Sequence, residues 1–330
     1  MNDFAQTLHD LTHGEALPKR RALAKAITLM ESTRQDHRQQ ADQLLTQLLP
    51  HTGKSMRIGL SGVPGVGKST LIENLGLWLI TQGHKVAVLA VDPSSSLSGG
   101  SILGDKTRME LLSNNPAAYI RPSPSSGTLG GVAEKTRECI LLCEAAGYDI
   151  VIVETMGVGQ SETTVAGMTD MFVVMQLPNA GDDLQAIKKG IMEIADVVLI
   201  NKSDLDENAA AQAQAFIESA FHLLAGHAKA MTAATKWHPK ALSLSALSGS
   251  GVSEFWSVVS DFKQRQKESG EWQNRRQSQS LMWLQELIQT GLKMAFIQNP
   301  KVASYLPSLE QDVLHGRIAA STAARQLLAL

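Results

Sequence analysis

The chain has 330 residues, of which 43% are hydrophobic and 19% charged, and its formal net charge is -2. This composition is ordinary for a folded protein, and the absence of a basic excess argues against a dedicated nucleic-acid binder. No apolar run is long enough to span a membrane, and the first residues lack a signal peptide's basic and apolar regions. We therefore expect a cytoplasmic protein that binds neither nucleic acid nor a membrane.

In chain order, residues 1–50 have a helical pattern, and residues 51–253 alternate strands with helices. Most of the strands are continuous apolar runs, typical of a parallel sheet buried on both faces. They are expected at 56–61, 85–91, 148–154, 171–176, 197–200 and 241–245, with intervening helices that include 70–82, 132–146 and 207–224. The last of these helices carries an apolar stripe of Phe216, Ala220, Leu223 and Leu224. The fold class is α/β, with an open, mostly parallel sheet and helices on both faces.

Residues 254–330 are expected to form a helical C-terminal extension, which gives three parts: 1–50, 51–253 and 254–330. A long amphipathic helix presents Leu281, Leu284, Ile288 and Leu292 on one stripe, either packed on the main domain or used between subunits. Ser308 and Gln311 resemble a capping box before another helix.

A phosphate-binding motif, G-x-x-x-x-G-K-[ST], occupies residues 62–69 between an expected strand and an expected helix. The glycines let backbone N–H groups face phosphate, Lys68 reaches the outer phosphates, and the Ser69 hydroxyl can hold Mg²⁺. This motif predicts a P-loop NTPase. The residues expected to line the phosphates are Gly62, Val63, Pro64, Gly65, Val66, Gly67, Lys68, Ser69 and Thr70.

The identity of the base is indicated by Asn201, Lys202, Ser203 and Asp204, an N-K-x-D at the end of an apolar strand. A carboxylate there accepts hydrogen bonds from the ring N–H and the amino group of guanine, whereas adenine would leave it desolvated and unpaired. The segment Ser245, Ala246 and Leu247 is similar to the one that closes over guanine in GTPases. The expected ligands are GTP and GDP, with Mg²⁺.

Three acids fit a nucleotide hydrolase. Asp92 and Glu154 end expected strands, at the edge where ligands bind in an open α/β sheet, and Asp105 follows a glycine-rich loop. Each can hold Mg²⁺ or orient the attacking water, so the expected metal ligands are Ser69, Asp92, Asp105 and Glu154. The expected catalytic residues are Lys68, Asp92 and Glu154, with Asp92 positioning the water. No motif assigns an arginine finger, for which Arg108 is a candidate.

Small and polar residues fill three segments, 94–108, 157–163 and 179–189, which are candidates to order around the γ-phosphate. In the third, Lys188 or Lys189 reaches phosphate or a rim acid, or else faces water at a helix start. Cys139 and Cys143 are four apart in an expected helix, and we interpret them as reduced thiols on a packed face.

Together the segments G-V-P-G-V-G-K-S-T, A-V-D-P-S-S, G-D-K-T-R-M, V-E-T-M-G-V-G-Q-S-E and N-K-S-D resemble the MeaB/ArgK family of SIMIBI-class P-loop GTPases. The resemblance implies a GTPase chaperone that protects adenosylcobalamin-dependent methylmalonyl-CoA mutase and assists its cofactor loading or exchange. It also implies a homodimer made partly by the C-terminal helices, places Asp92, Asp105 and Glu154 in the Mg²⁺ and water shell, and gives residues 179–189 a role in contacting the mutase.

Two alternatives remain open. The first is a kinase or ATPase of lysine/arginine/ornithine transport, an older label of the same family. No residue marks a place for an acceptor hydroxyl, and the N-K-x-D argues against ATP. The second is a metal-delivery GTPase, although the closest histidine pairs, His9/His13 and His222/His227, have no supporting cysteine.

Overall fold

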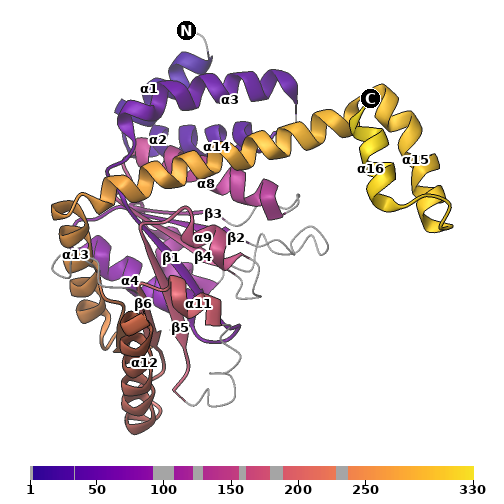
Figure 1. Ribbon diagram of the computed structural model, residues 1–330. Coiled ribbons are helices and arrows are strands. Elements are labelled where there is room, and N and C mark those ends of the chain that lie inside the picture. Colours follow the sequence, from indigo (N-terminus) through magenta and orange to yellow (C-terminus); the bar gives the residue numbers. More distant parts are fainter. Residues whose placement is uncertain are drawn as a thin grey trace. The chain divides into compact units, whose positions relative to one another are not determined.

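The computed structural model describes residues 3–32, 34–91, 108–121, 129–155, 161–178, 189–227 and 237–330. Contacts between residues divide the chain into two compact units, Met1–Gln273 and Asn274–Leu330, which are described separately (Figure 1). Among the described residues, no helix combines the length and the apolar character needed to cross a membrane.

The first unit is built on a sheet whose described strands are all parallel, in the order β3-β2-β4-β1-β5-β6-β7. Their carboxyl ends therefore meet at one edge, where ligands bind in open α/β folds. The strands are β1 Met56–Gly62, β2 Val86–Val91, β3 Ala118–Arg121, β4 Ile150–Thr155, β5 Met171–Gln176, β6 Val197–Ile200 and β7 Lys240–Ser243. The predicted α/β class with a parallel sheet is confirmed.

Helices cover both faces of this sheet, as predicted. Alternate strand residues point to opposite faces, so Val151 and Val153 of β4 belong to the core cluster that includes residues of α2, α3, α8 and α12, whereas Ile150 and Ile152 belong to the cluster that includes residues of α4 and α13. Figure 1 shows α8 on one side of the sheet and α4 on the other. The helices of this unit are α1 Asp3–His13, α2 Ala16–Glu31, α3 Gln35–Leu48, the 3-10 turn η1 Leu49–His51, α4 Lys68–Thr81, α7 Glu110–Asn114, α8 Leu129–Ala145, α9 Glu162–Ala166, α11 Lys189–Ile194, α12 Glu207–His227 and α13 Val252–Glu268.

The predicted apolar stripe of α12 is wrong. Phe216 and Leu223 are 60% and 69% exposed, and the buried face consists of Ala210, Ala213, Ile217 and Phe221. The small alanines bring the helix close to β6 and β7, which it contacts. The buried face therefore combines two alanines with Ile217 and Phe221, and it differs from the face that the apolar stripe predicts.

The cysteines on α8 and the packing of α13 concern two further sequence predictions, the state of the thiols and the boundary near residue 254. Cys139 and Cys143 are free and buried, as predicted, and burial raises the pKa of Cys139 to about 12. Phe255, Val259 and Phe262 of α13 belong to the core beside the sheet. The division of the chain near residue 254 stays a prediction, but α13 packs as part of the first unit.

The second unit has its own small core of Val302, Leu309, Ala323 and Leu327. It comprises the part of α14 Glu271–Gln298 from Asn274 onward, α15 Pro300–Leu314 and α16 Ala320–Leu328. The stripe Leu281, Leu284, Ile288 and Leu292 on α14 is more than half exposed at every position.

The predicted capping box in this unit is wrong. Ser308 lies inside α15, where its hydroxyl donates to the Tyr305 carbonyl oxygen at 2.8 Å. The helix is capped instead by Asn299, whose side chain accepts a hydrogen bond from the Lys301 backbone N–H at 3.0 Å. Pro300 at the first helical position fits this start, because its missing N–H needs no partner there.

Candidate nucleotide-binding site

The phosphate loop lies between the end of β1 and the start of α4, where the motif predicts it. Gly62 has φ 152°, and a β-carbon there would meet the Met175 carbonyl oxygen at 2.6 Å. Gly67 caps α4 in the left-handed region at φ 102°. Glycine at these two positions lets the loop turn tightly beside β5 and enter the helix with its backbone N–H groups at the helix N-terminus.

Lys68 is buried at the base of this loop, with only 8% exposed. Its ammonium donates to the carbonyl oxygens of Gly62, at 2.7 Å, and Val63, at 3.3 Å. Burial lowers the pKa of Lys68, while the charges of Glu154 and Glu162 act in the opposite direction. The loop thus holds a desolvated cation where phosphate oxygens can replace its carbonyl partners.

Glu154 lies beside Ser69, and the Ser69 hydroxyl is 3.5 Å from the Glu154 carboxylate. Glu154 is buried on β4 and is in register with Leu60 of β1 and Ala90 of β2. A hydroxyl and a carboxylate are hard oxygen ligands of the kind that Mg²⁺ prefers, so this pair fits the predicted metal site. Of the four predicted metal ligands, Ser69, Asp92, Asp105 and Glu154, the structure describes Ser69 and Glu154, and it brings these two together.

Asp92 and Asp105 lie outside the described residues. The same holds for all of residues 94–107, and for residues 157–160 and 179–188 of the other two polar segments, including Lys188. The chain leaves β2 at Val91, whose register partner is Thr155, the residue after Glu154. Arg108 is described, and its charge lowers the pKa of Lys68.

In the part of the site expected to bind the base, Asn201 connects the phosphate loop with the S-A-L segment. Its side chain is buried; Nδ2 donates to the Val66 carbonyl oxygen at 2.7 Å, and Oδ1 accepts from the Ala246 backbone N–H at 2.8 Å. Lys202 has φ 62°, so the chain turns in the left-handed region immediately after Asn201. Asp204 is exposed beyond this turn, where a ligand can reach its carboxylate.

The S-A-L segment is a turn held partly by hydrogen bonds within the turn. Ser245 is buried; its N–H donates to the Ser250 carbonyl oxygen at 3.0 Å, and its hydroxyl accepts from the Ser248 N–H at 3.2 Å. Leu247 is 79% exposed at the tip of the turn. Buried anchors and an exposed apolar tip suit a segment that covers a flat base.

Sequence reasoning missed two residues near this site. Glu162 lies in the first turn of α9, is 2% exposed, and acts electrostatically on Lys68. Asn74 of α4 donates a hydrogen bond from Nδ2 to the Ala246 carbonyl oxygen. The available signals were a second acid a few residues after Glu154, and an asparagine inside the apolar run that opens the helix.

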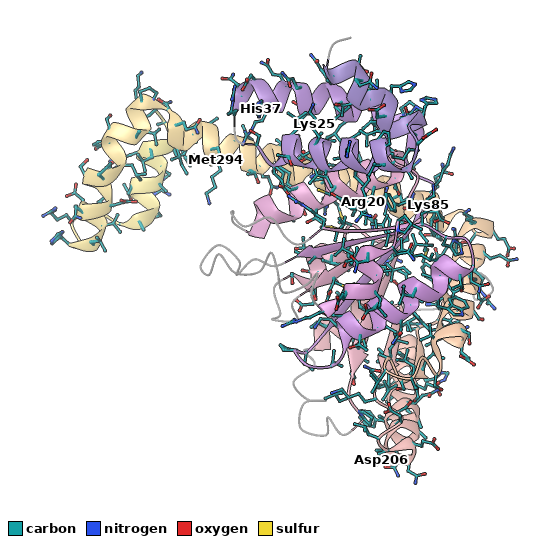
Figure 2. All side chains as sticks on the ribbon, turned by 180° about the vertical axis from the view of Figure 1, so that it is seen from behind. Arg20, Lys25, His37, Lys85, Asp206 and Met294 are labelled. Carbon is teal, nitrogen blue, oxygen red and sulfur yellow. The ribbon has the colours of Figure 1, made fainter. Side chains whose placement is uncertain are left out.

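A pocket of about 960 Å³ lies elsewhere in the first unit, among α1, α2 and α3, and includes Lys25 and His37. Figure 2 labels both residues, and it shows Asp206, which follows the N-K-S-D segment, at the other end of the unit. The pocket carries no phosphate-binding motif, so the nucleotide site is assigned from the loop between β1 and α4. Among the described residues, no group of three or more His, Cys, Asp or Glu side chains is placed to hold a metal ion.

Comparisons with known proteins agree on one family. The sequence model of "Methylmalonyl Co-A mutase-associated GTPase MeaB" matches residues 23–301. The chain is 49% identical over 325 residues to a putative GTPase of Caulobacter vibrioides, covering 98% of both chains. It is 46% identical to the GTPase ArgK of Escherichia coli, covering 98% of this chain and 95% of that one.

A mitochondrial methylmalonic aciduria type A homolog of Mus musculus is 47% identical, covering 94% of this chain and 76% of that one. The crystal structure of a LAO/AO transport system kinase superposes with a TM-score of 0.76 at 38% identity, covering 100% of this chain and 98% of that one. Family match, identity and fold coincide over nearly the whole chain. The chain is therefore a P-loop GTPase that belongs to the MeaB family.

Proposed function

We propose that this protein binds and hydrolyses GTP as a chaperone of adenosylcobalamin-dependent methylmalonyl-CoA mutase, protecting the mutase and assisting its cofactor loading or exchange. The proposal rests chiefly on membership of a family described as mutase-associated, with a methylmalonic aciduria type A homolog among the relatives. The structural observation that supports its nucleotide-binding part is Asn201, which joins the phosphate loop to the S-A-L segment.

In the proposed reaction, Lys68 neutralises the charge that develops on the transferred phosphoryl group. It moves from the loop carbonyls to phosphate oxygens when GTP binds. Ser69 and Glu154 would hold Mg²⁺, which would supply further charge neutralisation at the phosphates. Asp92, the residue after Val91 in the sequence, is assigned to orient the attacking water.

Guanine specificity is assigned to Asp204, with Asn201 fixing the position of the loop that carries it. The N-K-S-D backbone is held on one side by Asn201 and on the other by the Ser203 N–H, which donates to the Leu244 carbonyl oxygen at 3.2 Å. An exposed carboxylate on a rigid turn can pair with the ring N–H and amino group of guanine.

The mutase role requires a nucleotide-dependent contact. We propose that residues 94–108, 157–163 and 179–189 respond to the γ-phosphate, and that the last of these contacts the mutase. A nucleotide that tightens mutase binding must then itself bind more tightly in the complex. We further propose that the protein is a homodimer.

The test is a binding titration against the purified mutase with GDP and with a non-hydrolysable GTP analogue, alongside GTP turnover with and without mutase. We expect affinity to depend on the nucleotide and turnover to rise with mutase. Lys68→Ala is the control, because it removes the phosphate contact and should lose turnover in both conditions. No binding in either state would overturn the chaperone role, and γ-phosphate appearing on a protein acceptor rather than as inorganic phosphate would favour the kinase alternative.

A further inference from the structure

Asn74 contacts the base-recognition half of the site from an element that belongs to the phosphate half. It lies on α4, six positions after Lys68, and its side-chain amide donates to the Ala246 carbonyl oxygen. The Ala246 N–H donates to Asn201 Oδ1 at 2.8 Å. Both backbone polar groups of Ala246 are therefore bound by asparagine side chains from two different elements.

These contacts form a closed ring. Asn201 reaches from Ala246 back to the Val66 carbonyl oxygen at 2.7 Å, and Val66 is joined to Asn74 through the first turns of α4. The ring links the phosphate loop, the N-K-S-D segment and the S-A-L segment. The side-chain amide of Asn201 forms one side of it, and that of Asn74 forms the other.

The position of Ala246 matters because the rest of its turn is held mainly by contacts within the turn, such as Ser245 with Ser248 and Ser250. Ala246 is 2% exposed, whereas Leu247 next to it is 79% exposed. A buried carbonyl that loses its donor costs more than the hydrogen bond itself is worth. Removing the Asn74 amide would therefore favour movement of Ala246, and with it the exposed tip.

We infer that Asn74 is a positioning residue for guanine-nucleotide retention: it holds the S-A-L segment in the place where that segment covers the base, without touching the nucleotide. The inference rests on guanine-nucleotide binding at this site and is independent of the mutase. Since the ring holds the base side rather than the phosphates, its loss should shorten the residence time of bound nucleotide and leave phosphoryl transfer intact.

The experiment measures the dissociation rate of a fluorescent GDP and the single-turnover hydrolysis rate of pre-bound GTP in the full chain. Asn74→Ala should release GDP about tenfold faster, while the single-turnover rate stays within about twofold. Asn74→Asp has the same shape but presents an acceptor to the Ala246 carbonyl, so release should be at least as fast as from Asn74→Ala. Asn299→Ala, which removes an asparagine hydrogen bond in the second unit, is the matched control and should leave release unchanged.

Wild-type dissociation from Asn74→Asp would overturn the inference, because the donor would then be dispensable. Equally fast release of GDP from Asn299→Ala would also overturn the inference, since general destabilisation would then explain the faster release. Failure of the wild-type protein to bind GDP would instead overturn the guanine-nucleotide assignment itself. If Asn74→Ala does not fold, GDP release from Asn74→Asp is the deciding measurement.

Discussion

The backbone of Gly67 passes so close to Asn201 that a β-carbon at position 67 would overlap the Asn201 side-chain amide nitrogen. Asn201 occupies this place because its amide also contacts Val66. The glycine that starts α4 therefore serves two purposes: it adopts φ 102°, and it leaves room for the side chain that connects the phosphate and base halves.

Gly67→Ala should weaken GTP binding about 100-fold, since it combines a backbone strain of about 1 kcal/mol with loss of the two Asn201 hydrogen bonds. An equilibrium titration with a fluorescent GTP analogue measures the change. Gly83→Ala is the control, because Gly83 also has positive φ, at 88°, but a β-carbon there meets no atom within 4 Å. Equal affinity losses in the two variants would contradict the role given to Asn201.

Asp204→Asn should lose affinity for GTP and gain affinity for xanthosine triphosphate. Xanthine carries an oxygen where guanine has its amino group, so an amide at position 204 donates where the carboxylate would repel. Competition titrations with both nucleotides on both proteins provide the test. Wild-type protein that binds ATP as tightly as GTP would show the assignment of Asp204 to be wrong.

Glu144→Gln should lower the free energy of unfolding by about 3 kcal/mol at pH 7, because it leaves the buried Arg57 guanidinium without a charged partner. Glu144 accepts from Arg57 at 2.8 Å, from Ser55 at 2.5 Å and from the Gly53 N–H at 2.8 Å. Burial alone would raise the pKa of Glu144, but these hydrogen bonds and the Arg57 charge outweigh burial and hold the pKa below the ordinary value of 4.5.

A carboxylate with a lowered pKa contributes stability above its unfolded-state pKa and loses that contribution as the pH falls through the folded-state value. The difference between wild type and Glu144→Gln should therefore be full at neutral pH and shrink as the pH falls below about 4.5. Urea unfolding at a series of pH values measures it. Glu268→Gln, on the exposed end of α13, is the control; a pH-independent difference for Glu144→Gln would refute the ion-pair explanation.

Ending the chain after Gln273 should weaken self-association and leave GTP binding intact. The removed unit contains the exposed stripe Leu281, Leu284, Ile288 and Leu292, whereas α13 stays because Phe262 is part of the sheet's core. Sedimentation of the shortened and full-length proteins is the measurement. The double variant Leu284→Glu, Ile288→Glu should also weaken association; an unchanged oligomer in both cases would exclude this stripe as the interface.

Most of the sheet was predictable because its strands are long apolar runs between turn signals. β3 was not: in Ala118–Arg121 only Tyr119 and Ile120 are large apolar residues, so no apolar run marks the strand, whereas β6 has the same length but is apolar throughout. The face of α12 failed for another reason. Large apolar residues occur on more than one side of α12, so hydrophobicity alone does not identify the buried face: Phe221 is buried, whereas Phe216 is exposed.

The parts of the site formed by residues that are neighbours in the chain could be predicted from the sequence, whereas contacts between distant residues could not. Residues 62–70 and 201–204 form motifs because their chemistry depends on neighbours in the chain. Asn74 escaped prediction because its partner, Ala246, is 172 residues away. A contact of this kind has no spacing rule, so only the folded chain reveals it. The same is true of the charge of Glu162 near Lys68.

The ring through Val66, Asn201, Ala246 and Asn74 also orders events during synthesis. Its longest contact joins residues 172 positions apart, Asn74 and Ala246, and the ring can close only after Ala246 has left the ribosome. Until then, a nascent chain that already contains the whole phosphate loop lacks the contacts that bind it to the base half, and long-range contacts of this kind form slowly. If this ring retains the nucleotide, as inferred above, a growing chain should hold nucleotide firmly only after more than three-quarters of it has been made.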